Sequence, residues 1–277
     1  MNKIAGIQLA RAVAALAVAY FHSKTALAHF PAGGGYPNPF LMQYGFYAVD
    51  FFFAISWFVV CIVADRKPFN PLTFVIKRAF RIYPIWIAAA LAYWPLRYGF
   101  AMPEGGLPYV LRSLLLLPTN GFPLLDVGWS LQHEVIFYAA SAIIIPFAGR
   151  IGLAAYLAVV SVALYSVGLP DWLIPFARFY PAFLAGMIAY WTAKRANAGW
   201  LVPLAVGAAI FYGCTFATDP RPWLPISFIP LLVGFANMRV NSKLLVGLGD
   251  ASYSIYLLHP LVFFALYKAS IGMHLPV

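Results

Sequence analysis

The chain has 277 residues, of which 63% are hydrophobic and only 9% are charged. A soluble domain carries about a quarter charged residues, so this composition excludes a water-facing globule. Apolar runs of about 20 residues recur along the sequence, and each is long enough to cross a bilayer as a helix. Because the runs lack the alternation of barrel strands, the sequence predicts an all-α membrane protein.

The net charge of +10 would suggest nucleic acid as a partner in a soluble protein. Here the Lys and Arg residues stand mainly at the ends of apolar runs, where the positive-inside rule expects them. We therefore expect this positive charge to set the topology of the protein in the membrane. The expected partner is the lipid bilayer, and no nucleic acid is expected. Cys61 and Cys214 lie in apolar runs without CxxC spacing, so neither a disulfide nor a metal site is expected.

The apolar runs predict a polytopic integral-membrane bundle of about nine transmembrane helices, within a range of eight to ten, and a single domain over residues 1–277. If the N-terminus is cytoplasmic, the basic connectors fall on the cytoplasmic side, and the poorer connectors, such as 31–43 and 219–223, fall on the other. The basic connectors are 66–81, Arg150, 194–195 and 239–243. The first run is read as a retained span and not as a signal peptide. Residues 101–127 are expected to form a loop with a short interfacial helix near 109–117. The predicted spans are 5–28, 44–64, 82–100, 128–148, 151–168, 179–193, 200–217, 223–238 and 252–271.

Arg11 and His22 are polar residues in the first predicted span. Eleven residues return a helix to within roughly 20° of its starting direction, so the two side chains share one face, roughly 16 Å apart. Ala15 and Val18 leave that face nearly smooth between them. A cation near the cytoplasm with a base deeper in the membrane would suit a long ligand with an anionic head. The alternative is that Arg11 snorkels to the interface and His22 only bonds a neighbouring helix.

Asp50 and Glu134 are the two acids that we place within the membrane. A buried carboxylate needs a cation or several donors, and His22 is a natural partner for Glu134, because a carboxylate on one ring nitrogen raises the basicity of the other. Asp50 is more simply explained as orienting backbone or the end of a span. His133, beside Glu134, competes for the same role.

Arg78 and Arg81 stand at i and i+3, so both project from one face if their segment is helical, and two guanidiniums form a good fork for phosphate. The alternative is an ordinary positively charged flank. His259 precedes Pro260 in the last predicted span. It is either a second polar wall of the site or a packing histidine.

Taken in order, these segments resemble the acyltransferase-3 family of bacterial membrane acyltransferases. The resemblance runs from residue 5 to about 260. It lies in Arg11…His22, Val49-Asp50-Phe51-Phe52-Phe53-Ala54-Ile55-Ser56, Arg78-x-x-Arg81 with Ile82-Tyr83-Pro84, Trp129-Ser130…Glu134, and Tyr253-Ser254-Ile255-Tyr256…His259.

The resemblance implies an enzyme of the bacterial cytoplasmic (inner) membrane. It would move an acyl group, usually acetyl, from cytoplasmic acetyl-CoA to a hydroxyl of an extracytoplasmic or lipid-linked saccharide such as O-antigen or exopolysaccharide. His22 is then the catalytic residue, as general base or transient acyl carrier, and Glu134 orients it. Arg11, Arg78 and Arg81 hold the CoA. Substrate or structural support falls to Asp50, Trp129, Ser130, Tyr256 and His259.

Two features depart from the family pattern. The family usually reads Ser-Gly-Phe where this chain has Ser56-Trp57-Phe58, so tryptophan fills space that glycine would leave. The family also commonly has one further span. The competing functions are a small transporter or flippase with a polar path through Arg11, Glu134 and His22, and a catalytically idle homologue that binds lipid-linked sugar. No internal repeat supports the transporter.

Overall fold

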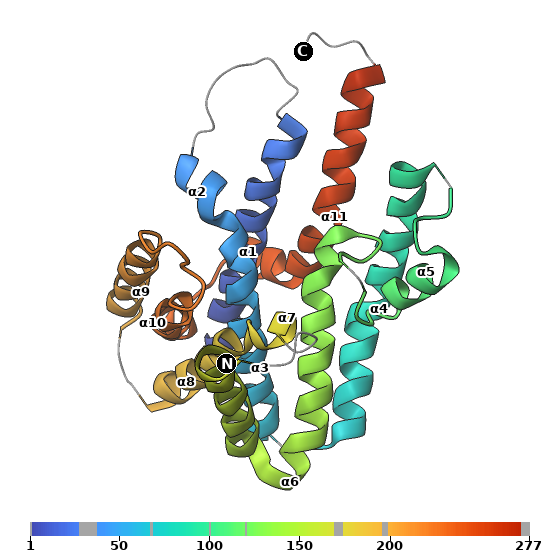
Figure 1. Ribbon diagram of the computed structural model, residues 1–277. Helices are drawn as coiled ribbons and strands as arrows, with labels where there is room; N and C mark the ends of the chain where they lie inside the picture. Colours follow the sequence, from blue (N-terminus) through green and yellow to red (C-terminus); the bar gives the residue numbers. More distant parts are fainter. Residues whose placement is uncertain are drawn as a thin grey trace. The chain divides into compact units, whose positions relative to one another are not determined.

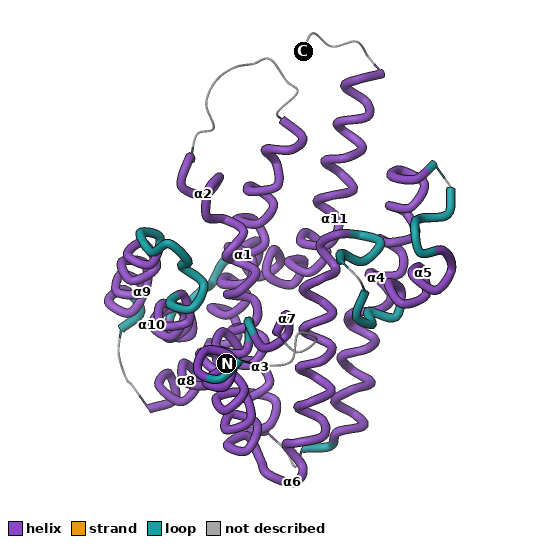
Figure 2. The backbone as a smooth tube through the Cα atoms, in the orientation of Figure 1, coloured by secondary structure: helices purple, strands orange, loops and turns teal. Residues whose placement is uncertain are grey.

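The computed structural model describes residues 2–27, 38–66, 69–99, 101–119, 121–168, 174–195 and 199–272. All regular secondary structure in these ranges is helical, which confirms the all-α prediction (Figure 1 and Figure 2). The helices in chain order are α1 (Asn2–Leu27), α2 (Pro39–Tyr44), η1 (Gly45–Tyr47), α3 (Ala48–Arg66), α4 (Pro71–Tyr98), α5 (Gly106–Leu114), η2 (Asp126–Gly128), α6 (Trp129–Ser166), α7 (Ile174–Ala177), α8 (Tyr180–Arg195), α9 (Leu201–Cys214), α10 (Leu224–Asn237) and α11 (Lys243–Gly272).

Two Asn-Pro pairs start helices that the apolar runs did not delimit. The Asn38 carboxamide oxygen accepts a hydrogen bond from the Leu41 amide at 3.0 Å, and the Asn70 carboxamide oxygen accepts one from the Thr73 amide at 2.9 Å. Each asparagine is an N-cap, followed by a proline whose fixed φ suits the first helical position. Helix α4 therefore begins at Pro71, ahead of the predicted membrane span 82–100. Its basic segment, with Arg78 and Arg81, is helical.

A break at Gly149 divides the long helix α6. This residue has φ 62° and ψ −170°, a conformation that glycine adopts without steric cost. The sequence predicted two spans that meet here, 128–148 and 151–168, and the structure confirms the break. Arg150 follows it directly, at the point where the chain changes direction.

The described helices fall into two compact units. The first comprises Met1–Ala14, Tyr47–Val75 and Phe137–Ala251, and within it α3, α8, α9 and α10 pack against one another. The second comprises Ala15–Phe46, Ile76–Ile136 and Ser252–Val277. Helices α1, α4, α6 and α11 contribute residues to both.

Glycine permits a close helix contact between α3 and α8 in the first unit. A Cβ on Gly186 of α8 would lie 2.0 Å from the Ala54 carbonyl oxygen of α3. Trp57 is fully buried and packs on Phe137 with ring centroids 5.4 Å apart. Its indole N–H donates to Cys61 Sγ at 2.7 Å. The space that a glycine at 57 would leave is thus filled by the indole, and the close approach occurs at residue 186.

In the second unit, side chains of α4 and α6 hold the irregular segment 101–127. The Trp86 indole N–H donates to the carbonyls of Ser113 and Leu114, at 3.2 and 3.1 Å. The Tyr83 hydroxyl donates to the Leu115 carbonyl at 3.0 Å, and the Gln132 amide donates to the Leu117 carbonyl at 2.6 Å. Irregular backbone next to a membrane needs such donors, because lipid supplies none. The predicted short helix is present here as α5.

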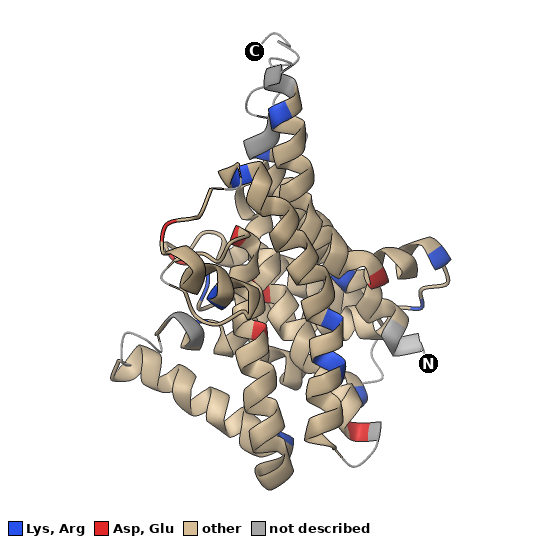
Figure 3. Ribbon diagram, turned by 90° about the vertical axis from the view of Figure 1, so that its right-hand side faces the viewer, with Lys and Arg blue, Asp and Glu red and all other residues tan. Residues whose placement is uncertain are grey.

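Three described helical segments are long and apolar enough to cross a bilayer: Ala5–Lys24, Pro39–Asp65 and Asp126–Ser166. Charged positions are sparse along the ribbon in Figure 3. These features make the chain a membrane protein. The count of nine spans, the single domain and the cytoplasmic N-terminus stay predictions.

Candidate functional site

His22 of α1 and His259 of α11 meet in the second unit. His22 Nδ1 lies 3.0 Å from His259 Nε2, and the two rings stack with centroids 5.0 Å apart and planes 24° from parallel. His259 is buried, with 6% of its surface exposed, and His22 is half-buried. One ring donates its N–H and the other accepts, so each ring fixes the tautomer of its partner.

Helix α11 presents Tyr253, Tyr256 and His259 at successive intervals of three residues. The Tyr253 hydroxyl donates to the Ile82 carbonyl of α4 at 2.8 Å, and the Tyr256 hydroxyl donates to the Val127 carbonyl at 2.9 Å. Tyr256 also shares a 2.7 Å hydrogen bond with the Ser130 hydroxyl. Tyr256 and His259, both predicted site residues, therefore lie along one side of α11, and the predicted residue Ser130 of α6 lies beside Tyr256. The hydroxyl contacts restrain the helix that carries His259.

The first turns of α6 hold the remaining predicted residues of this unit. The Glu134 carboxylate is close enough to the hydroxyls of Tyr253 and Tyr256 to act on both electrostatically. His133 Nδ1 lies 2.7 Å from the Trp129 carbonyl, and its ring packs edge-on against the Trp129 indole. His22 Nδ1 contacts the ring of His259, and the sequence did not predict this pairing. Orientation of His22 by Glu134 stays a prediction.

The three predicted CoA-binding arginines belong to different units, so each is placed within its own. In the first unit, Arg11 donates to the Gln8 carboxamide oxygen at 3.0 Å, and the Gln8 amide donates to Asp250. In the second, Arg78 is half-buried and Arg81 is exposed on α4. Arg81 acts electrostatically on Tyr253, the neighbour of Glu134. Their role in binding phosphate stays a prediction.

Asp50 is buried in the interior of the first unit and paired with a cation. Its Oδ1 accepts from Arg221 Nε at 3.2 Å, and the Arg221 guanidinium also lies over the rings of Tyr47 and Phe179. Arg221 comes from the connector 219–223, which the sequence treated only as poor in charge. The ion pair fits the structural interpretation of Asp50, because a buried carboxylate at the start of a helix needs a cation.

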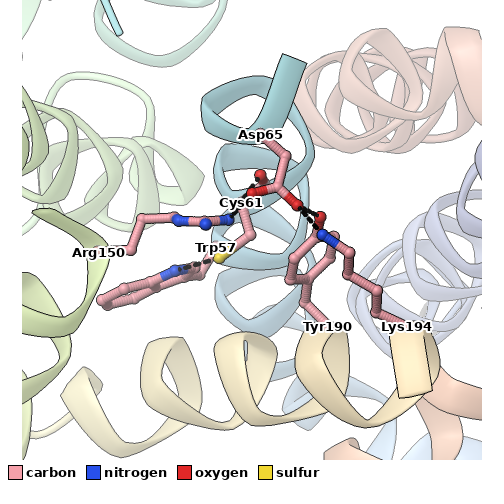
Figure 4. A network of polar contacts seen from close by, with 6 residues as sticks. All are labelled: Trp57, Cys61, Asp65, Arg150, Tyr190 and Lys194. Carbon is pink, nitrogen blue, oxygen red and sulfur yellow. Dashed lines mark hydrogen bonds and ion pairs between the residues drawn. The ribbon is translucent and has the colours of Figure 1, made fainter. Parts of the chain in front are cut away.

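A second polar cluster, at the opposite end of α3, was not predicted. Asp65 forms ion pairs with Arg150 of α6 and, at 2.8 Å, with Lys194 of α8, and it accepts a hydrogen bond from Tyr190 (Figure 4). The sequence assigned Arg150 and Lys194 to basic connectors on one side of the membrane, and here both contact one carboxylate. Such solvent-accessible pairs contribute little stability singly, so the cluster is better seen as joining three helix ends.

In the part of the chain that the structure describes, no three His, Cys, Asp or Glu side chains are grouped so as to hold a metal ion. The site itself provides an imidazole pair, buried at His259 and half-buried at His22, with tyrosine hydroxyls on α11 beside it. This combination suits proton transfer at a hydroxyl and group transfer through a nitrogen.

Comparison with known proteins identifies the family of the chain. The sequence model of a family described as an acyltransferase domain matches residues 4–276, and the chain belongs to this acyltransferase-3 family. The chain is similar to the exopolysaccharide production protein ExoZ of Rhizobium meliloti (strain 1021), with 32% identity over 257 residues. The match covers 82% of this chain and 79% of the relative. No solved structure matches the chain.

Proposed function

We propose that this acyltransferase moves an acyl group, acetyl in the first instance, from cytoplasmic acyl-CoA to a hydroxyl of an extracytoplasmic or lipid-linked saccharide. The observation that carries the proposal is the contact of the half-buried His22 with the buried His259 in a chain of this family. The saccharide class is supported by the similar protein, whose name assigns it to exopolysaccharide production.

The proposed reaction needs a base that removes the proton of the acceptor hydroxyl. If His22 carries its own proton on Nδ1 and donates it to His259 Nε2, the second nitrogen of His22 keeps a lone pair for this task. The acceptor oxygen then attacks the thioester carbonyl carbon, the C–S bond breaks, and the proton held by His22 passes to the departing CoA sulfur. The alternative, in which His22 briefly carries the acyl group, uses the same lone pair as nucleophile.

His259 is a positioning residue in this proposal. Its acceptor nitrogen favours the reactive tautomer of His22, and the imidazolium that forms on His22 keeps a hydrogen-bond acceptor 3.0 Å away. In this proposal Glu134 supplies the negative charge that stabilises the imidazolium on His22. Burial strengthens each of these interactions, because a low-dielectric site screens charge less than water does.

The donor side of the proposal assigns the CoA phosphates to Arg11, Arg78 and Arg81. Arg78 and Arg81 lie one turn apart on α4, so two guanidiniums are available to one phosphate group. The Gln8–Asp250 contact holds Arg11 in a defined position on α1. All three stand in segments that the sequence predicts to be near the cytoplasmic face, where acyl-CoA is found.

Calorimetry with acetyl-CoA and purified protein tests the donor assignment. We expect Arg78→Ala/Arg81→Ala to weaken binding at least about tenfold for each charge-assisted hydrogen bond to phosphate that the substitutions remove. Arg112→Ala, which removes an exposed arginine from α5, serves as the control and should bind as the wild type does. Unchanged affinity in the double variant would refute the assignment, and a wild type without affinity for any acyl-CoA would refute the proposed function.

A further inference from the structure

Arg97 and Asp126 form an accessible ion pair in the second unit, which also holds the histidine pair. Arg97 Nη1 lies 2.8 Å from Asp126 Oδ2 and 3.2 Å from the Tyr93 hydroxyl. The two charged side chains are 40% and 49% exposed, so the pair lies at the surface of the unit. None of the motifs that resemble the family includes this pair.

Tyrosines surround the pair. The Arg97 guanidinium carbon lies 5.9 Å from the ring centroid of Tyr93 and 5.6 Å from that of Tyr98. Tyr109 of α5 interacts electrostatically with Asp126, is within hydrogen-bonding reach of Tyr98, and donates to the Phe122 carbonyl at 3.1 Å. Half-buried rings and polar groups are thus presented together on one small surface, the Arg97–Asp126 patch, made of Arg97, Tyr98, Tyr109 and Asp126, while Tyr93 is buried and holds Arg97 through its hydroxyl.

The backbone beneath Asp126 is fixed. The next residue, Val127, is buried, and its carbonyl accepts hydrogen bonds from both Tyr256 and Ser130. A Cβ on Gly128 would lie 2.2 Å from the Trp86 ring, so the helical turn that carries Asp126 fits directly against α4. A site held this firmly meets the requirement that recognition groups be preorganised.

The patch is also near the proposed catalytic residue. The Val127 carbonyl, which follows Asp126 in the chain, accepts from Tyr256, and the ring of Tyr256 lies 6.0 Å from that of His259, the partner of His22. A ligand on the patch would therefore lie close to the proposed catalytic histidine.

We propose that the Arg97–Asp126 patch binds a sugar ring of the acceptor saccharide. The inference rests on the proposed function and adds to it the residues that recognise the acceptor. Sugar hydroxyls accept from a guanidinium and donate to a carboxylate, and the apolar faces of a sugar ring pack on tyrosine. Asp126 Oδ1 is available for such a hydroxyl, because the contacts of this carboxylate with the described residues run through Oδ2.

The charge of the patch favours a sugar over acyl-CoA, the acyl donor, as its ligand. Arg97 is already neutralised by Asp126, so the pair has no net charge with which to attract the phosphates of CoA. A neutral, hydroxyl-rich ring needs donors and acceptors side by side, and the ion pair supplies both. Arg78 and Arg81, in contrast, present two guanidiniums one turn apart on α4, a pattern that suits an anion.

Binding of simple glycosides tests the proposal. Wild-type protein in lipid nanodiscs would be titrated with the methyl glycosides of glucose and galactose, and binding followed by saturation-transfer NMR. We expect Arg97→Gln and Asp126→Asn each to weaken binding by about tenfold, the effect of one charge-assisted hydrogen bond. Asp219→Asn removes an exposed carboxylate from the Arg178–Asp219 pair, whose atoms are 3.6 Å apart, and should change binding less than about twofold.

A charge exchange separates recognition from a structural role. Arg97→Asp combined with Asp126→Arg keeps an ion pair but moves the guanidinium off the tyrosine rings, so binding should remain weak. Restoration of wild-type binding by the exchange, wild-type binding in both single variants, or no glycoside signal from the wild type would overturn the proposal. Acetyl-CoA calorimetry on the same samples tests the proposed function separately, since its failure with the wild type would refute that function and leave a glycoside site at Arg97 standing.

Discussion

A histidine that acts as a base at one nitrogen needs its proton held on the other. In this protein His259 Nε2 faces His22 Nδ1 at 3.0 Å, which places an acceptor where that proton must be. The sequence identified both histidines but paired His22 with Glu134, because a carboxylate is the commoner partner. The two histidines are 237 positions apart in the chain, so no local pattern could have revealed their contact.

Variants of His259 test this pairing. His259→Ala should lower the turnover rate by about 10² or more, since His22 loses the acceptor that favours its reactive tautomer. His259→Gln should recover part of the rate, because its carboxamide oxygen lies near the position of Nε2. Acyl transfer would be measured at saturating acetyl-CoA, with thermal unfolding of each variant as a check of the fold. Full activity in His259→Ala would contradict the assignment.

At the scale of helices, apolar runs located the elements but not their ends. Helices α4 and α11 begin at Pro71 and Lys243, ahead of the predicted membrane spans 82–100 and 252–271. The capping residues were present in the sequence: Asn70 caps α4, and the Ser242 hydroxyl accepts from the Leu245 amide at 3.4 Å at the start of α11. Hydropathy does not identify N-caps, because the capping residue and the polar first turn of a helix can lie outside the membrane and need not be apolar.

The contact between α3 and α8 yields a stability prediction. Gly186→Ala places a Cβ 2.0 Å from the Ala54 carbonyl oxygen, and because this atom belongs to the backbone, the helices must separate. We expect the free energy of unfolding to fall by about 1–3 kcal/mol, the usual effect of overpacking. Gly213→Ala, with no atom within 4 Å of its Cβ, is the matched control. Thermal unfolding in detergent measures both, and equal melting temperatures would show that α8 does not pack so closely on α3.

At the scale of the whole chain, charge predicted which connectors share a side of the membrane. Within the first unit, Asp65 contacts both Arg150 and Lys194, which come from two connectors placed on the cytoplasmic side. Arg221, from a connector placed on the other side, contacts Asp50 at the opposite end of α3. The sequence could not predict these pairings, because a charge count shows which residues share a side but not which of them touch.

Cysteine labelling in intact cells tests this topology. In a Cys214→Ser background, Asp219→Cys should react with a membrane-impermeant maleimide, and Gly199→Cys should react only after the membrane is disrupted. Both positions are exposed, and the remaining native Cys61 is fully buried. The opposite labelling pattern would place the N-terminus outside the cytoplasm.

The central claim, that His22 performs acyl transfer in this chain, is tested most directly by one comparison. Inverted membrane vesicles that contain wild type or His22→Ala would receive acetyl-CoA labelled in the acetyl group, and label in the saccharide fraction would be counted. The account predicts transfer by the wild type and a rate at least about 10²-fold lower in His22→Ala, while calorimetry shows that the variant still binds acetyl-CoA. Transfer by His22→Ala at the wild-type rate would contradict it.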